Sequence, residues 1–212
     1  MEQSLESLVN TSWARCWRAL GAEGDGAELM QQLLTAYREP QRKYHTLQHL
    51  TECLTLLQKH LDLAEQPGEV EIALWFHDAV YDVKASDNEQ KSADWAARSL
   101  TEAGVSQEVI DRVVQLIMAT RHAVLPQGRD QQLLVDIDLA ILGSSRERFL
   151  EYEQQISEEY SWVPEALFRH KRRAVLEEFM ARSPIYNTAA LRQKLERLAK
   201  ENLAFSLERL AG

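Results

Sequence analysis

Helical periodicity runs through nearly the whole sequence, and it limits what this chain can fold into. Apolar residues recur every three or four positions in segments such as "HLTECLTLLQKHL" (49–61) and "QEVIDRVVQLIMATRH" (107–122). This spacing places apolar side chains on one face of an α-helix. The breaks between segments are rich in Gly, Pro, Asp and Asn, and no segment shows strand alternation bounded by hairpin turns. The sequence therefore predicts an all-α protein with roughly nine or ten helices.

The chain shows no internal repeat and no low-complexity linker. With 212 residues, of which 45% are hydrophobic and 27% charged, it is long enough to bury a core. We predict a single compact helical domain over residues 1–212. The patterns Ser86-x-x-Glu89 and Ser144-x-x-Glu147 match capping boxes and predict two helix starts.

Net charge and apolar run lengths exclude several function classes. The net charge of −9 argues against a general nucleic-acid-binding surface. No apolar segment approaches the roughly 18 residues that a membrane span needs, and the acidic N-terminus has no signal-peptide pattern. The two cysteines, Cys16 and Cys53, lack CxxC spacing and fit a reducing compartment. We expect a cytoplasmic protein with no membrane partner.

Three histidines and a carboxylate lie in sequence that otherwise resembles core. His45 and His49 are four residues apart, which would place them on one helix face at a spacing that two metal ligands can use. A capping or hydrogen-bonded surface pair would give the same spacing. His77 has apolar or aromatic neighbours three and four positions away and should face inward. Asp78 follows directly, and a buried carboxylate needs a partner or a cation.

Two aspartates interrupt the apolar run "LLVDIDLAILG" (133–143). The neighbours of Asp138 at three and four residues are all apolar, whereas those of Asp136 are mixed, so Asp138 is predicted to face inward. A buried Arg or a backbone amide could also satisfy it. Together these residues form a mixed nitrogen and oxygen set that suits Mn, Fe, Co, Ni or Zn, and an oxygen-rich second position could take Mg.

Five blocks in order resemble the HD-domain metal-dependent phosphohydrolases, most closely a group of small bacterial proteins. The blocks are "YHTLQH" (44–49), "FHDAVYD" (76–82), "NEQKSA" (88–93), "DIDLAILG" (136–143) and the segment 159–186. The resemblance covers roughly residues 40–186. It implies an HD-domain fold with a core over approximately 40–145, on which the flanking N- and C-terminal helices pack.

The resemblance also implies a ligand set and an acid. The implied ligands of a first divalent metal are His49, His77, Asp78 and Asp138. His45 matches a histidine that protonates the leaving oxygen in the related cyclic-nucleotide phosphodiesterases. Those enzymes carry Asn where this chain has Thr46, so cyclic-nucleotide hydrolysis is not implied. The alternative role of His45 is a hydrogen-bond partner of the ligands.

Other polar residues are weaker candidates. His122 and Arg172 could contact a substrate phosphate. Equally, His122 could interact with a helix C-terminus, and Arg172 could belong to a solvated charged face. Asp82 could orient the metal ligands, and Glu89 lies where related proteins place a ligand for a second metal. For Glu89, completion of the capping box is the simpler interpretation.

The sequence thus predicts a phosphohydrolase that acts on a phosphate ester, such as a nucleotide or a related small molecule. Asp78 and His45 are its predicted catalytic residues, and the metal would activate water. One alternative is a non-catalytic sensor of the same fold that binds metal and nucleotide. Another is a helical scaffold whose histidines are hydrogen-bond partners in the core.

Overall fold

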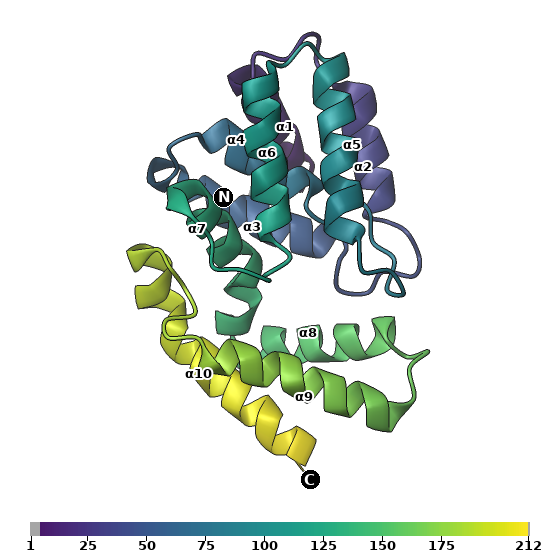
Figure 1. Ribbon diagram of the computed structural model, residues 1–212, viewed down its shortest axis with the longest axis vertical. Helices are drawn as coiled ribbons and strands as arrows, with labels where there is room; N and C mark the ends of the chain where they lie inside the picture. Colours follow the sequence, from purple (N-terminus) through teal and green to yellow (C-terminus); the bar gives the residue numbers. More distant parts are fainter. Residues whose placement is uncertain (1–4, 212) are drawn as a thin grey trace. The chain divides into compact units, whose positions relative to one another are not determined.

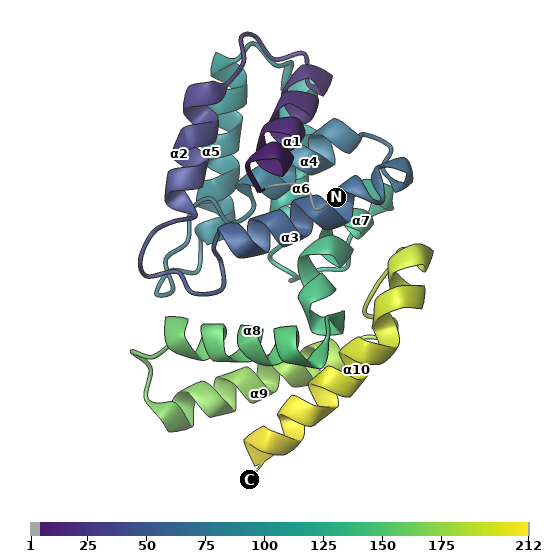
Figure 2. The same ribbon diagram turned by 180° about the vertical axis from the view of Figure 1, so that it is seen from behind.

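In the computed structural model, which describes residues 5–211, all the regular structure is helical (Figures 1 and 2). The prediction of an all-α fold is confirmed. Within the described range the elements are α1 Leu5–Ala19, α2 Ala27–Ala36, α3 Leu47–Gln58, η1 Leu61–Leu63, α4 Pro67–Phe76, α5 Asn88–Glu102, α6 Gln107–Ala119, α7 Gly128–Asp138, η2 Leu139–Gly143, α8 Arg146–Glu159, α9 Glu165–Ala181 and α10 Ala189–Ala211. The elements η1 and η2 are 3₁₀ helices.

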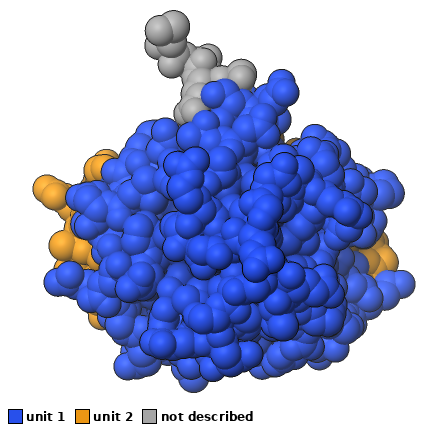
Figure 3. Space-filling view, turned by 90° about the horizontal axis from the view of Figure 1, so that it is seen from above, with its two compact units in different colours: residues 1–137 blue, residues 138–212 orange. Residues whose placement is uncertain are grey.

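The chain divides into two compact units, residues 1–137 and residues 138–212, coloured separately in Figure 3. The predicted single domain has its core over approximately 40–145, so the division at residue 138 falls near the end of that predicted core. Each unit is described by itself below.

Helix α4 forms the centre of the first unit. Every residue from Gly68 to Phe76 is buried, and α1, α3, α5 and α6 all contact this helix (Figures 1 and 2). Its side chains are mostly apolar and point in all directions, so other helices must cover it on every side, which explains its position. Pro67 at the first turn lacks an amide hydrogen that would have no helical partner there. Because the surrounding helices cover α4 as far as Phe76, its C-terminal end lies inside the unit.

Two buried glutamates connect α4 to its neighbours. Glu71 accepts hydrogen bonds from Arg15 and Ser12 of α1, at 2.9 Å from Arg15 Nε and 2.7 Å from Ser12 Oγ. Glu69 accepts from Arg112 of α6 at 2.8 Å and 2.7 Å. Buried carboxylates are tolerated when they are paired in this way, so these contacts set the position of α4 along its axis.

Glu153 of α8 links the helices of the second unit. Its carboxylate accepts a hydrogen bond from Nε of Arg172, on α9, at 3.1 Å, and another from Oγ of Ser206, on α10, at 3.0 Å. At the other end of the unit, Nδ2 of Asn202 donates to the carbonyls of Leu142 and Ser144 at 2.8 Å and 3.0 Å. These bonds hold α10 against η2 and α8.

Among the helices of the described range, none has both the length and the apolar character that crossing a membrane requires.

Candidate metal centre

His49 enters the core because α3 begins just before it. Thr46 is the N-cap residue, and its hydroxyl accepts a hydrogen bond from the amide of Gln48 at 3.3 Å. His49 therefore lies in the first turn of the helix and is 2% exposed. The hydroxyl of Tyr44 lies 3.0 Å from His49 Nδ1, so the other ring nitrogen, Nε2, points away from that contact.

His45 lies outside α3. It precedes the N-cap residue Thr46, so the expectation that His45 and His49 share one helix face is wrong. The two rings are still neighbours, with centroids 6.1 Å apart. The half-buried ring of His45 stacks on Tyr81 at a centroid distance of 4.0 Å. His45 thus lies beside the ligand candidates and comes from the loop before α3.

His77 and Asp78 lie at the end of α4. The helix stops at Phe76, and His77 is its C-cap residue, so the histidine–aspartate pair is not inside a helix as predicted. Adjacent residues on a helix diverge by about 100°, yet at this helix end Asp78 Oδ2 still lies 3.0 Å from His77 Nε2. His77 Nδ1 lies 2.8 Å from the carbonyl of Leu74. A carbonyl only accepts, so Nδ1 carries the hydrogen and a neutral His77 ring has its lone pair on Nε2.

Three potential ligand atoms converge at this point of the first unit. His49 Nε2 and His77 Nε2 are 3.1 Å apart. Asp78 Oδ2 lies 3.0 Å from His77 Nε2 and 3.5 Å from His49 Nε2. Both histidine side chains are almost fully buried, whereas the Asp78 side chain is 17% exposed. The carboxylate is therefore the side of the group that solvent reaches.

These separations fit a transition metal. Metal–ligand bonds of about 2.1 Å at angles of about 90–109° separate neighbouring ligand atoms by about 3.0–3.4 Å. The three measured separations lie in or next to that range. In the metal-free protein, a proton between the two Nε2 atoms would join the rings as a hydrogen bond. A cation would replace that proton, so metal binding and protonation compete at this position.

The surroundings of Asp78 favour its ionised form. Burial raises the pKa of the carboxyl group, but the nearby imidazoles of His77, His45 and His49 lower it by more, so its pKa lies below the ordinary value. A carboxylate that stays ionised is available as a metal ligand. The same interaction shows that all three rings are close enough to Asp78 to act on its charge.

Arg42 fixes the turn that contains Asp78. Its guanidinium is buried and donates to the carbonyl of Asp78 at 2.5 Å and to that of Ala79 at 2.9 Å. It also donates to the carbonyl of His45 at 3.2 Å and to the carboxylate of Glu39 at 3.0 Å. One side chain thus holds the loop before α3 and the turn after α4 in fixed relation.

Cys53 is a further potential metal ligand, which the sequence did not predict. It lies one turn after His49 on α3, is buried, and has Sγ 3.8 Å from both ring nitrogens of His49. Ligand atoms of His49, Cys53 and His77 all lie within 4.8 Å of one another, so this group could hold a metal ion. The signal for it was the His-x-x-x-Cys spacing, which puts both residues on one helix face.

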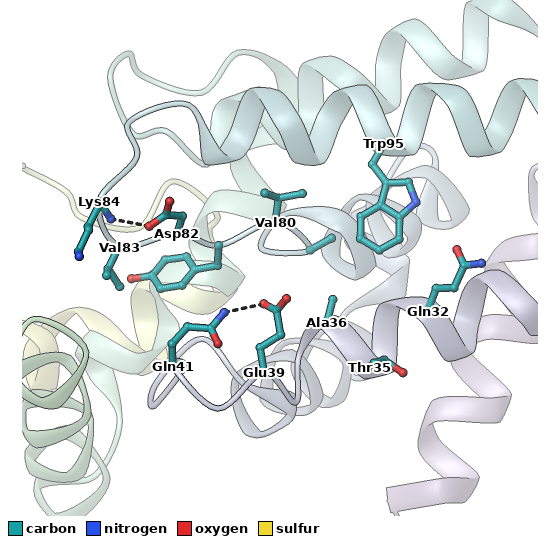
Figure 4. A pocket seen from close by; sticks show the side chains of 12 residues that line it. Gln32, Thr35, Ala36, Glu39, Gln41, Val80, Asp82, Val83, Lys84 and Trp95 are labelled. Carbon is teal, nitrogen blue, oxygen red and sulfur yellow. Dashed lines mark hydrogen bonds between the residues drawn. The ribbon is translucent and has the colours of Figure 1, made fainter.

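A cavity of about 750 Å³ is lined by residues 79–84 together with residues of α2, the loop after it and α5 (Figure 4). Its walls include Ala36 of α2, Trp95 of α5, Val80 and Tyr81. Glu39 and Asp82 line its polar part, and each accepts a hydrogen bond from a neighbouring residue that also lines it, Gln41 and Lys84 respectively. Tyr81, which lines the cavity, also stacks on His45, so the cavity and the converging histidines share this neighbour.

The weaker candidates of the first unit lie at several places. Asp82 is exposed, and its carboxylate accepts from the amide of Lys84 at 2.9 Å. Glu89 is in the first turn of α5, but the N-cap residue is Asp87, so the predicted Ser86 capping box is wrong. His122 follows α6 with a positive φ of 55° and is half-buried. Their predicted roles stay predictions.

The second unit contains the other two candidates. Asp138 is its first residue and the last residue of α7. Asp138 is half-buried and Asp136 fully buried, which is the reverse of the predicted order.

Arg172, predicted to bind phosphate, is paired with Glu153. The Ser144 capping box is also wrong, because Ser145 is the N-cap residue of α8.

Comparisons of this chain with protein-family models, with curated proteins and with solved structures find no match.

Proposed function

We propose that this chain is a metal-dependent phosphohydrolase that acts on a phosphate ester, with the metal held by His49, His77 and Asp78. The observation that carries the proposal is the convergence of two Nε2 atoms and one carboxylate oxygen at mutual distances of 3.0–3.5 Å. The ordered motifs that resemble HD-domain phosphohydrolases supply the reaction class. From the sequence resemblance alone, we add Asp138 as a fourth ligand.

The ligand set decides which ions are candidates. Two imidazoles and a carboxylate suit Mn, Fe, Co, Ni or Zn better than Mg, which prefers oxygen ligands. When bound, such an ion lowers the pKa of water and neutralises charge on a phosphoryl group. His77 is oriented for this task by its hydrogen bond to the Leu74 carbonyl, which fixes the tautomer and the ring plane.

His45 is the proposed proton donor to the leaving oxygen. It belongs to the loop before α3, its ring is half-buried, and it lies beside His49 and close enough to Asp78 to lower the pKa of that carboxyl group. Stacking on Tyr81 restricts the ring to one plane. Arg42, which donates to the carbonyl of His45 and to that of Asp78, positions the donor relative to the carboxylate.

The test is a hydrolysis screen with metal-free protein. Aryl phosphates and nucleotides are incubated with Mn, Co, Ni, Zn or Mg added singly, and released phosphate is measured. We expect activity with at least one transition metal and its loss in His77→Gln. His60→Gln is a matched control, since His60 is also buried and its Nδ1 contacts a backbone carbonyl, that of Leu56, at 2.9 Å. Equal activity in both variants would contradict the proposal.

A non-catalytic sensor of metal and nucleotide is the second candidate. One contact favours it. Asp82 was predicted to orient the metal ligands, but its carboxylate accepts a hydrogen bond from the amide of Lys84 and so shapes a turn. A chain that binds metal and a nucleotide at equilibrium but releases no phosphate with any of the five ions would be this sensor.

A further inference from the structure

Helix α3 presents two potential ligands to the same point. His49 and Cys53 are one turn apart, and both side chains are buried, at 2% and 3% exposure. Side chains on a helix lean towards its N-terminus, so Cys53 leans back over His49. Its sulfur lies 3.8 Å from each ring nitrogen of His49, and ligand atoms of His49, Cys53 and His77 lie within 4.8 Å of one another.

The sulfur lies beside the ring of His49, at nearly the distance from Nε2 that a thiolate ligand would have. With Zn–S bonds of about 2.3 Å and Zn–N bonds of about 2.0–2.1 Å, a tetrahedral site separates sulfur from nitrogen by about 3.5–3.6 Å. The measured 3.8 Å between Cys53 Sγ and His49 Nε2 exceeds this by only a few tenths of an ångström. The sulfur is equally far from Nδ1, which faces away from the metal position, so a change of the Cys53 rotamer must carry Sγ round to the Nε2 side when the ion binds.

We infer that Cys53 is a thiolate ligand of the proposed metal centre and selects thiophilic ions, Zn²⁺ and Co²⁺, over Mn²⁺ and Mg²⁺. The inference rests on the metal site of the proposed function but does not depend on hydrolysis. Soft sulfur ligands bind zinc and cobalt well and contribute little to binding magnesium or manganese. The thiol coordinates as thiolate, and its proton passes to solvent when the ion binds.

Sulfur ligation also has a consequence for reactivity. With Cys53 added to His49, His77 and Asp78, zinc has the four protein ligands of a structural site even before Asp138 is counted, whereas a catalytic zinc site keeps one position for water. Harder ions, which do not recruit the thiolate, keep positions for water and substrate. If the chain hydrolyses phosphate esters, zinc therefore inhibits the wild type and inhibits Cys53→Ser much less.

Absorption spectroscopy with Co²⁺ tests the inference without any substrate. Metal-free protein is titrated with Co²⁺, and the sulfur-to-cobalt charge-transfer band in the near ultraviolet is measured together with the visible bands of bound cobalt. We expect the charge-transfer band in the wild type and in Cys16→Ser. Cys16 is a matched control, because it is the other buried cysteine and its thiol contacts the carbonyl of Trp13. Cys53→Ser should keep the visible bands and lose the charge-transfer band.

The outcomes separate this inference from the proposed function. Bound cobalt without a charge-transfer band, or a band that persists in Cys53→Ser, overturns the role of Cys53 and leaves hydrolysis unaffected. The band in a protein that hydrolyses no ester supports the role of Cys53 and counts against the enzyme. If Cys53→Ser does not fold, Cys53→Ala replaces it. In competition titrations, either variant should lose at least about 10-fold of the wild-type preference for Zn²⁺ over Mn²⁺.

Discussion

At the residue scale, the tautomer of His77 determines what the centre can bind. The Leu74 carbonyl accepts a hydrogen bond from His77 Nδ1–H, so the lone pair is on Nε2, which faces His49 and Asp78. A histidine held in this way is a ready metal ligand and needs no rearrangement. His45, which comes from the loop before α3 and stacks on Tyr81, is the histidine that we assign a different role, that of proton donor.

Removal of His45 separates a proton donor from a ligand. We expect His45→Ala to keep the metal and to lose about 10²–10⁴-fold in turnover, the usual contribution of a general acid. Metal content and steady-state rates are measured on the same preparation, with Lys43→Ala, an exposed neighbour, as the control. A His45→Ala protein that no longer retains metal would instead make His45 a ligand.

Arg42 should matter for both stability and metal affinity. Arg42→Ala removes the donor from the carbonyls of Asp78 and Ala79, and each buried carbonyl left without a partner costs about 1–3 kcal/mol. The turn that carries Asp78 would loosen, and metal affinity should fall about 10–100-fold. Denaturant unfolding and metal titration measure the two effects. Arg38→Ala, at an exposed position, should change neither, and unaltered metal affinity in Arg42→Ala would disprove the positioning role.

At the scale of single elements, the close approach of α1 and α4 is a packing constraint that can be tested apart from the metal. A Cβ atom added at Gly68 would lie 2.5 Å from the Cβ of Ala19, which has no flexible part to move aside. Gly68→Ala should therefore lower the free energy of unfolding by about 1–3 kcal/mol. Adding Ala19→Gly should restore part of the loss. A Gly68→Ala protein as stable as the wild type would contradict this packing.

Helical periodicity predicted the elements but not their ends. Repeats such as that of α6 identify a helix, because burial of one face depends on spacing that the sequence shows directly. The end of α4 at Phe76 has no such marker. Apolar residues resume at Ala79 and Val80 after the His77–Asp78 pair, and the carbonyls at the stop are bound by Arg42, which is remote in sequence. Both predicted capping boxes were displaced by one residue: the N-cap of α8 is Ser145, whose hydroxyl accepts from the amide of Arg148, and that of α5 is Asp87, whose side chain makes no capping hydrogen bond.

The candidate centre was predictable in part. His49, His77 and Asp78 were identifiable because polar ligand types in apolar sequence are costly without a partner. Cys53 escaped notice because a buried thiol is also an ordinary core residue. The burial of Asp136 and Asp138 was predicted in the wrong order. Neighbours at three and four residues describe one helix face, and α7 ends at Asp138, beyond which that pattern no longer applies.

At the scale of the whole molecule, the sequence assigns one ligand, Asp138, to the residue where the second unit begins. We expect Asp138→Asn to strip or greatly weaken the metal and Asp136→Asn to keep it. Since Asp136 is fully buried, its variant needs a thermal melt beside the metal analysis to separate lost fold from lost ligand. A folded Asp136→Asn protein without metal, next to a metal-loaded Asp138→Asn, would reverse the assignment.

The metal content of folded protein tests the central claim most directly. Wild type, Asp78→Asn and Asp94→Asn are stripped, reloaded with Co²⁺ or Zn²⁺, dialysed and analysed for metal per chain. Asp94 is an exposed carboxylate on α5 and serves as the control. We predict about one ion per chain in the wild type and in Asp94→Asn, and far less in Asp78→Asn, because the converging group has then lost its charged ligand. A wild type that retains no ion, or an Asp78→Asn protein that retains as much as the wild type, would contradict the account.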